Sequence, residues 1–289
     1  MTEPVAEPGT GGTAPRCYRH PDRETWISCQ RCSRPICPDC MRPAAVGFQC
    51  PECVTEGQRT QRQARTVAGG RLPARPGLAS MVLIGINVAV FLLVQATGGR
   101  GSQLYAELIL LTPSAPAFGL TGVDDGGWWR LLTSAFLHVQ ILHVAFNMIA
   151  LYALGPPLER FVGHARLVAI YLTTGLAGSV AVVWLANPRI PTLGASGAVF
   201  GIFGAAIVLM RSRGYDVTSW LVLLGINLVI TFSVPNISWQ AHLGGLAAGA
   251  ALGAVLAYTP RERRRVVHPL AFVGMWVLLL GAVALHGVG

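Results

Sequence analysis

Lysine is absent from this sequence, and acidic residues are few. All 22 basic residues are arginine, Asp and Glu total 13, and charged residues make up 12% of the 289-residue chain. An ordinary soluble domain has about 25% charged residues. Hydrophobic residues reach 52% and the mean hydropathy is +0.51, so the composition excludes a soluble globular protein and predicts an integral membrane protein. We therefore interpret the net charge of +9 by its position along the chain, and we expect no nucleic-acid partner.

Cysteine is missing from most of the chain. All seven cysteines lie between positions 17 and 53, and the apolar segments that follow contain none. Residues 1–16 are rich in Pro, Gly and Thr and have no apolar core, so we expect a disordered leader and no secretory signal. The cysteines thus mark a separate N-terminal region.

Four close pairs of soft ligands make up that region, each pair with a gap of two residues. The eight candidates are Cys17, His20, Cys29, Cys32, Cys37, Cys40, Cys50 and Cys53. Each such pair can hold one side of a tetrahedral site, so the set suits two structural zinc ions. A disulfide-bonded domain is the alternative, which the odd number of cysteines and the lack of an export signal disfavour.

The spacing resembles that of B-box-type zinc fingers. The resemblance implies interleaved pairing, with one ion on Cys17, His20, Cys37 and Cys40 and the other on Cys29, Cys32, Cys50 and Cys53. A module this short has little core, so metal binding would supply much of its folding free energy. We expect the domain to cover residues 17–56 and to have a small core of Trp26, Ile27, Ile36 and Phe48.

Seven apolar segments of near-spanning length follow a basic linker at 57–77. They lie at about 79–96, 131–154, 167–186, 195–210, 217–234, 241–258 and 268–286. The fold class predicted is an all-α polytopic membrane protein, with a helical core at 78–260 and a basic loop plus a seventh transmembrane helix at 261–289. The segment 97–130 contains Pro113 and Pro116 and is expected to be a long non-helical loop. The linker is expected either to follow an anionic membrane face or to be a solvated tether.

Arginine is distributed unevenly between alternate loops. The linker and the loops near 160–166, 211–213 and 261–265 hold 13 arginines, whereas the intervening loops hold only Arg100, Arg130 and Arg189. Positively charged loops stay in the cytosol. We therefore expect a multi-pass cell-membrane protein whose N-terminus is cytosolic and whose C-terminus is outside.

The seven apolar segments contain no Asp, Glu, Lys or Arg. This disfavours a transporter that couples transport to charged side chains within the membrane. Their notable polar residues are Ser196, His242, His143 and Asn147. At 1.5 Å of rise per residue, Ser196 and His242 are expected about 9 Å and about 6 Å below the outer edge of the hydrocarbon core. A serine needs a neighbouring imidazole to accept its proton, and glycines at intervals of three or four residues allow these two segments to approach closely.

Four motifs resemble those of the rhomboid family of intramembrane serine proteases, over about residues 79–260. They are "WWR" at 128–130, "HVQILHVAFN" at 138–147, "GASGAVFG" at 194–201 and "AHLGGLAAG" at 241–249. The resemblance implies a six-helix bundle with one extra C-terminal helix. It also implies that Ser196 is the nucleophile, His242 the general base, and His143 and Asn147 oxyanion donors together with the Ser196 N–H. Phe200 departs from the family pattern, where tyrosine often stacks on the histidine, but it keeps the ring.

The function predicted is therefore a serine-type endopeptidase that cleaves transmembrane segments of single-span or polytopic membrane proteins near the outer face. It needs no cofactor for catalysis, and membrane lipid and a cytosolic partner of the zinc finger are the other expected partners. Two alternatives stay open at this point. One is a catalytically inactive rhomboid-like protein that binds membrane clients, and the other is a zinc-sensing adaptor that the spans merely anchor. His143 and Asn147 could also simply bond to each other or to neighbouring helices.

Overall fold

The computed structural model describes residues 13–60, 65–70 and 72–287. Contacts divide the chain into two compact units, Met1–Gln63 and Ala64–Gly289. Each unit is described by itself.

The N-terminal unit is built around its cysteines. A short 3-10 helix η1, Pro38–Cys40, precedes the antiparallel strands β1, Arg42–Pro43, and β2, Phe48–Gln49, and helix α1, Pro51–Thr60. Ile36 is fully buried among six buried cysteines. The prediction of a larger apolar core is wrong, because Trp26, Ile27 and Phe48 are 75%, 41% and 36% exposed. So small a unit fills its centre with thiols, which leaves room for one aliphatic side chain.

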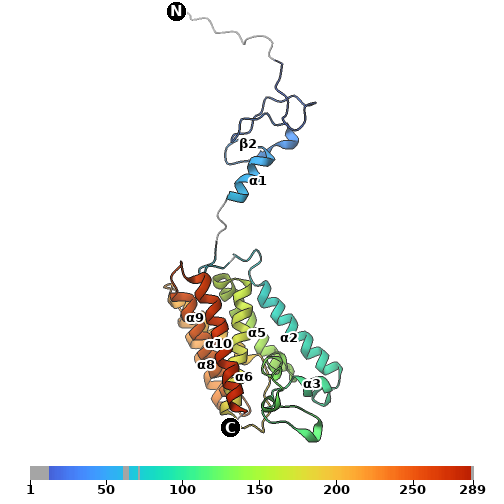
Figure 1. Ribbon diagram of the computed structural model, residues 1–289, viewed down its shortest axis with the longest axis vertical. Coiled ribbons are helices and arrows are strands. Elements are labelled where there is room, and N and C mark those ends of the chain that lie inside the picture. Colours follow the sequence, from blue (N-terminus) through green and yellow to red (C-terminus); the bar gives the residue numbers. More distant parts are fainter. Residues whose placement is uncertain (1–12, 61–64, 71, 288–289) are drawn as a thin grey trace, which may run out of the picture. The chain divides into compact units, whose positions relative to one another are not determined.

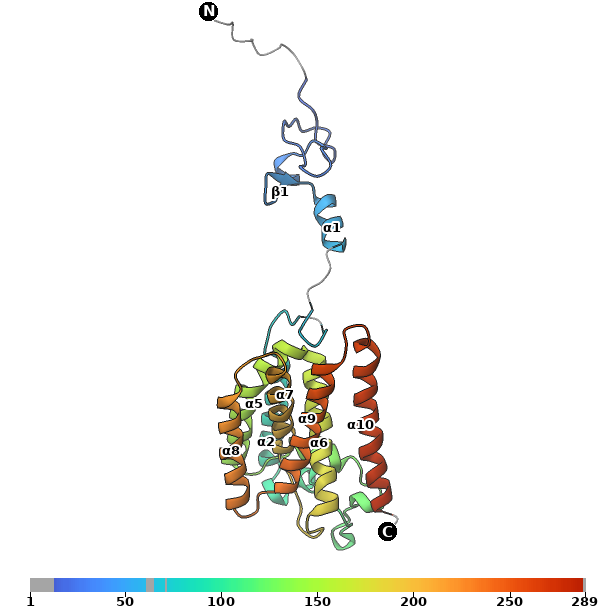
Figure 2. The ribbon, with the colours of Figure 1, turned by 90° about the vertical axis from the view of Figure 1, so that its left-hand side faces the viewer.

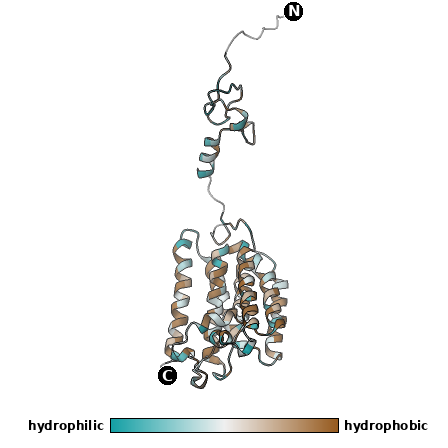
Figure 3. Ribbon diagram, turned by 90° about the vertical axis from the view of Figure 1, so that its right-hand side faces the viewer, coloured by the Kyte–Doolittle hydropathy of each residue, from teal (hydrophilic) through white to brown (hydrophobic). Residues whose placement is uncertain are grey.

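The second unit is a bundle of apolar helices, seven of them in the part of the chain that the structure describes (Figure 1). Their bounds are α2 Leu78–Ala96, α5 Ile141–Val162, α6 His164–Leu185, α7 Ser196–Arg211, α8 Thr218–Ser233, α9 Trp239–Tyr258 and α10 Arg264–His286. Five of them are long and apolar enough to span a membrane, and α7 and α8 are shorter, with 16 residues each. Hydrophobic residues cover the helices along most of their length (Figure 3). The predicted all-α membrane fold is confirmed.

The second apolar segment is not one helix from 131 to 154. It contains α4, Arg130–Thr133, the 3-10 turn η5, Ser134–Phe136, and a break before α5 begins at Ile141. Helix α5 then continues through Pro156 and Pro157 to Val162. Hydropathy could not locate the break, because the residues on both sides of it are apolar.

The segment 97–130 is not wholly non-helical. It contains α3, Gln103–Leu108, and the 3-10 turns η2 Gly99–Gly101, η3 Pro116–Phe118 and η4 Val123–Asp125. The buried Arg130 organises the segment from inside, because its guanidinium donates hydrogen bonds to the carbonyls of Thr121, Ala106 and Ile109 at 2.6–2.9 Å. Arg130 is therefore a structural residue of this loop.

Helices α6, α7 and α9 pack closely at the centre of the bundle, while α8 and α10 lie at opposite edges (Figure 2). The contact between α7 and α9 depends on glycine. A Cβ atom on Gly245 or Gly249 would overlap the carbonyl of Gly197 or Gly201, respectively. Small residues at this period let two helix backbones touch. The close approach predicted for these two segments is thus observed.

Candidate active site and metal centres

Ser196 and His242 lie at neighbouring ends of α7 and α9. Ser196 is the first residue of α7 and is half-buried, and His242 lies in the first turn of α9 and is 7% exposed. Their chain neighbours are in contact, since a Cβ atom on Gly197 would lie 3.2 Å from the carbonyl oxygen of Ala241. Phe200, one turn after Ser196, stacks on the His242 ring with centroids 4.2 Å apart. The side chains of Ser196 and His242 form no hydrogen bond with each other in the described residues.

Thr231 of α8 holds the imidazole of His242 from the other side. The Thr231 Oγ1 lies 2.7 Å from His242 Nδ1 and donates its own hydrogen to the carbonyl of Asn227, also at 2.7 Å. A hydroxyl has one hydrogen to donate, so Thr231 accepts the hydrogen bond from His242 Nδ1–H. In the neutral imidazole, this network places the proton on Nδ1 and leaves the lone pair on the Nε2 of His242.

The sequence did not predict a functional role for Thr231. It is one of two threonines in a mostly apolar helix and is 3% exposed. Threonines in membrane helices commonly bond to the carbonyl four residues earlier, as Thr231 does to Asn227. No spacing in the sequence distinguishes it from the other threonines, because its partner lies on another helix.

His143 lies against the turn that leads into Ser196. Gly194 in this turn has φ of 123°, and a Cβ atom there would lie 2.7 Å from the His143 ring. Asn147, one turn further along α5, is 7% exposed, and its amide donates to the His143 carbonyl at 3.0 Å. The two predicted oxyanion donors therefore share one helix face, and His143 reaches the Ser196 turn.

His138, the first residue of the motif at 138–147, supports the same turn. It is fully buried, its Nε2 accepts a hydrogen bond from the Ala195 N–H at 3.4 Å, and its ring meets His143 edge-on at 5.0 Å. The carbonyl of Ser134 accepts a second hydrogen bond from the Gly194 N–H at 2.9 Å. Residues in the break before α5 thus fix the backbone just ahead of Ser196.

Two groups of four ligands form in the N-terminal unit. One is Cys17, His20, Cys37 and Cys40, and the other is Cys29, Cys32, Cys50 and Cys53; within each group all ligand atoms lie within 4.8 Å of one another. The seven cysteines are free, so no disulfide forms. These groups have the membership that the B-box resemblance implies, and each could hold a metal ion.

The distances within the groups fit a tetrahedral ion. Zinc–sulfur bonds of about 2.3 Å place two sulfurs about 3.8 Å apart. The Sγ atoms of Cys32 and Cys50 are 3.8 Å apart, and the His20 Nδ1 lies 3.2–3.8 Å from the three sulfurs of its group.

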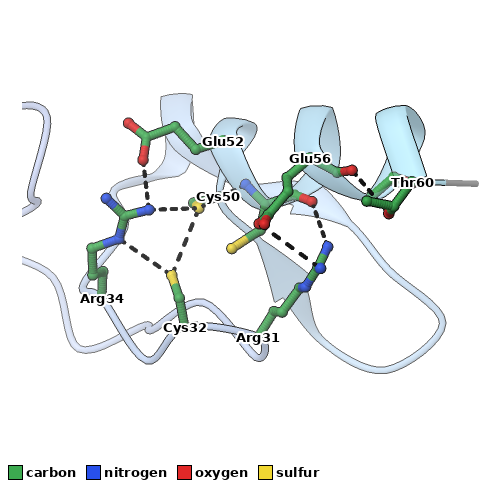
Figure 4. Close-up of polar contacts among 9 residues, drawn as sticks. Arg31, Cys32, Arg34, Cys50, Glu52, Glu56 and Thr60 are labelled. Atoms are coloured by element: carbon green, nitrogen blue, oxygen red, sulfur yellow. Dashed lines mark hydrogen bonds and ion pairs between the residues drawn. The ribbon is translucent and has the colours of Figure 1, made fainter.

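Arg34 links the second group to α1 (Figure 4). Its guanidinium donates to the Sγ of Cys32 at 3.3 Å, approaches the Sγ of Cys50 at 3.7 Å and pairs with Glu52 at 2.6 Å. The hydrogen bond from Arg34 lowers the pKa of the Cys32 thiol, which favours the thiolate that a metal ion requires. Arg31 fixes the same helix by donating to the Cys53 carbonyl at 2.9 Å.

Comparison with known proteins identifies the second unit. The model of the Rhomboid domain matches residues 125–259. "Rhomboid protease GluP" of Bacillus subtilis is 36% identical over 187 residues, which cover 60% of this chain and 34% of GluP. "Putative rhomboid protease YdcA" of the same organism is 35% identical over 148 residues, covering 50% of this chain and 74% of YdcA. "RHOMBOID-like protein 5" of Arabidopsis thaliana is 33% identical over 184 residues, 59% of each chain.

The extent of these matches differs between relatives. The match spans only about a third of the length of GluP, but nearly three quarters of YdcA. The matched region contains Ser196, His242 and the helices that carry them. On this similarity, the chain belongs to the rhomboid family.

Proposed function

We propose that this protein is a serine-type intramembrane endopeptidase that cleaves transmembrane segments of other membrane proteins. The observation that carries the proposal is the placement of His242 between the Phe200 ring and the Thr231 hydroxyl, beside the helix that Ser196 begins. An imidazole held on both sides, with its Nε2 left free, suits a general base. The similarity to named rhomboid proteases supports the same reaction.

Catalysis would be acyl transfer by a Ser–His dyad. The Nε2 of His242 takes the proton from Ser196 as its Oγ attacks the scissile carbonyl carbon. The tetrahedral intermediate then collapses, the amine leaves with the proton from His242, and water releases the acyl group from Ser196 by the same steps. Thr231 would perform part of the work that an aspartate performs in soluble serine proteases, because it fixes the tautomer of the base.

The oxyanion would be bound by His143, Asn147 and the Ser196 N–H. Ser196 is the first residue of α7, so its N–H belongs to the first turn and has no partner within the helix. The His143 ring lies against Gly194, two residues away. Each oxyanion donor is worth about 3–4 kcal/mol in soluble serine proteases.

The orientation proposed follows the arginine distribution. The N-terminus lies in the cytosol and the C-terminus outside, so Ser196 and His242 lie near the outer face of the cell membrane. Along the chain, a leader at 1–16 precedes a zinc finger at 17–56, a basic linker at 57–77, the protease core at 78–260 and the loop and seventh helix at 261–289.

The two ligand groups are proposed to hold structural zinc. Three thiolates with one imidazole, and four thiolates, are the usual donor sets of structural zinc sites, and four ligands leave no open position for chemistry. We propose that the zinc finger recruits a cytosolic protein or a substrate tail, and its exposed Trp26 is suited to such a contact.

The test uses the purified full-length protein in liposomes with a single-span reporter that carries Gly, Ala and Ser near its outer end. Wild type should cleave the reporter and react with a fluorophosphonate probe. The variants Ser196→Ala and His242→Ala should lose at least about a thousandfold in cleavage rate. Ser212→Ala, at the other end of α7, is the matched control and should cleave normally. Equal cleavage by the Ser196→Ala variant would overturn the proposal, and no cleavage or probe labelling by wild type would favour a client-binding protein.

A further inference from the structure

Four arginines meet at one end of the bundle, from separate parts of the chain. Arg65 precedes the turn at 66–70, Arg166 lies in the first turn of α6, Arg213 follows α7, and Arg264 begins α10. Arg264 donates to the turn at 66–70, and a Cβ atom on Gly70 of that turn would meet the Arg166 guanidinium. Arg213 and Arg264 donate to the carbonyls of Ala257 and Thr259, at the end of α9. Arg261 and one acidic residue, Glu262, precede Arg264 in the chain. In the part of the chain that the structure describes, none of the four arginines forms an ion pair within 4.0 Å.

Backbone carbonyls hold these side chains in place. Arg264 donates to the carbonyls of Val67 and Thr259 at 2.9 and 3.1 Å, and Arg65 donates to that of Gly69 at 3.2 Å. Arg166 is half-buried and donates to the Val162 carbonyl at 3.4 Å. These bonds use only some of the guanidinium N–H groups, and Arg65 is exposed while Arg166 and Arg264 are half-buried. Several positively charged donors are therefore held together at one end of the bundle.

The turn at 66–70 is shaped to lie between two of these arginines. Thr66 closes it by accepting a hydrogen bond from the Gly70 N–H at 2.8 Å. A Cβ atom on Gly70 would come within 2.5 Å of the Arg166 Nη1, and one on Gly69 would lie 3.5 Å from the Arg264 Cδ. Gly70 thus allows the backbone to approach the Arg166 guanidinium, and Gly69 provides the left-handed φ of 83° that the turn requires.

His268 is an independent observation at the same end of the bundle. It lies one turn after Arg264 on α10, is 1% exposed, and neither of its ring nitrogens has a hydrogen-bond partner. A buried imidazole is normally hydrogen-bonded, and an acceptor oxygen would satisfy its ring N–H.

We propose that Arg65, Arg166, Arg264 and His268 bind the phosphate group of an anionic phospholipid. Guanidinium groups match phosphate oxygens in geometry and charge. The site lies where α6 and α10 begin, which is the level of the headgroups when these helices cross a membrane. The bound lipid joins α10, which follows the family match at 125–259, to α6 within it. This site is separate from the proposed protease centre.

The test measures lipid binding by the full-length protein in neutral detergent, by native mass spectrometry with short-chain phosphatidylglycerol or phosphatidylcholine. Wild type should prefer phosphatidylglycerol. Since an arginine contributes roughly fivefold, the Arg166→Gln/Arg264→Gln variant should lose about 25-fold in affinity. The Arg160→Gln/Arg211→Gln control removes the same charge at the same end and should change less than twofold, because the described hydrogen bonds of the site include neither residue.

A second variant separates ligand binding from fold. His268→Leu should weaken phosphatidylglycerol binding while leaving the melting temperature in phosphatidylcholine equal or higher, because it removes an unsatisfied polar group. No preference for phosphatidylglycerol in wild type, or an equal preference in the Arg166→Gln/Arg264→Gln variant, would overturn the proposal. Displacement of the lipid by millimolar inorganic phosphate would overturn the assignment to a phospholipid and indicate a free-phosphate site.

Discussion

Phe200 stacks on His242 with their ring centroids 4.2 Å apart and their planes inclined by only 14°. The two residues come from α7 and α9, so the stack connects the helix that begins with Ser196 to the proposed base. Phe200 is 4% exposed and cannot leave the imidazole without opening a cavity. The contact requires an aromatic ring and no hydroxyl.

Two substitutions of Phe200 should therefore test the ring and an added hydroxyl separately. Phe200→Leu removes a stacking contact worth about 1 kcal/mol, so the rate of reporter cleavage at saturation should fall roughly fivefold. Phe200→Tyr keeps the ring and should stay near the wild-type rate. Steady-state kinetics measures both variants, and a larger loss for Phe200→Tyr than for Phe200→Leu would contradict the stacking role.

Thr231 offers a test of how the base is held. Thr231→Val has nearly the same shape but cannot accept the hydrogen bond from His242 Nδ1–H. A hydrogen bond of this kind is worth about 1–1.5 kcal/mol, so kcat should fall about tenfold while KM changes little. The control is Thr231→Ser, which keeps the acceptor and should retain most activity. Wild-type kcat in Thr231→Val would show that His242 is oriented without Thr231.

Gly194 is constrained twice, by its backbone angle and by the His143 ring. Gly194→Ala should strain the turn by about 1–3 kcal/mol and push His143 away from Ser196. We expect a lower melting temperature and a loss of cleavage larger than that of Phe200→Leu. Gly225→Ala is a suitable control, because a Cβ atom there has nothing within 4 Å. A fully active Gly194→Ala variant would remove His143 from the proposed oxyanion site.

These positions show which features the sequence could predict. Glycines at 197, 201, 245 and 249 predicted the α7–α9 contact, because backbone approach is encoded in the period of small residues along each helix. The paired cysteines predicted the eight ligands of the N-terminal unit, because a metal site depends on ligand type and short spacing, and the B-box resemblance predicted which four belong to each group.

Other features could not be predicted, because they depend on contacts between separate elements that no local sequence pattern indicates. Thr231 acts through a residue 11 positions away on another helix, and the break before α5 is fixed by His138 and Ser134 meeting the turn at 194–195. Trp26 looked like a core residue because it is large and apolar, but the core of so small a unit was already filled.

Glu159 is a further residue whose structural role the sequence did not predict, because it lies in a basic stretch. Its side chain is fully buried and accepts hydrogen bonds from the N–H groups of Gly77, Ala79 and Ser80 at 3.0–3.2 Å, where α2 begins. It also lies 2.5 Å from the Nδ1 of His164. A carboxylate here satisfies the free amides of the first turn of α2 and complements its dipole.

Glu159→Gln should consequently destabilise the bundle. The amide presents an NH₂ group to donors that had faced carboxylate oxygens, and we expect a loss of about 3 kcal/mol. For a unit of this size, that corresponds to a fall of about 6–12 °C in melting temperature, measured in detergent. Arg160→Gln, at the next, exposed position, should melt like wild type. An unchanged melting temperature for Glu159→Gln would show that the cap contributes little.

Metal content tests the two ligand groups and their membership. Wild type should contain two zinc ions per chain by elemental analysis. Cys17→Ser/Cys37→Ser removes two ligands from one group, so it should keep one zinc ion, whereas pairing of ligands in chain order would damage both sites and leave none. Cys17→Ser/Cys29→Ser affects both observed groups and should lose both ions. Because a domain this small depends on its metal to fold, chelation should expose residues 17–60 to protease while the helical bundle stays intact.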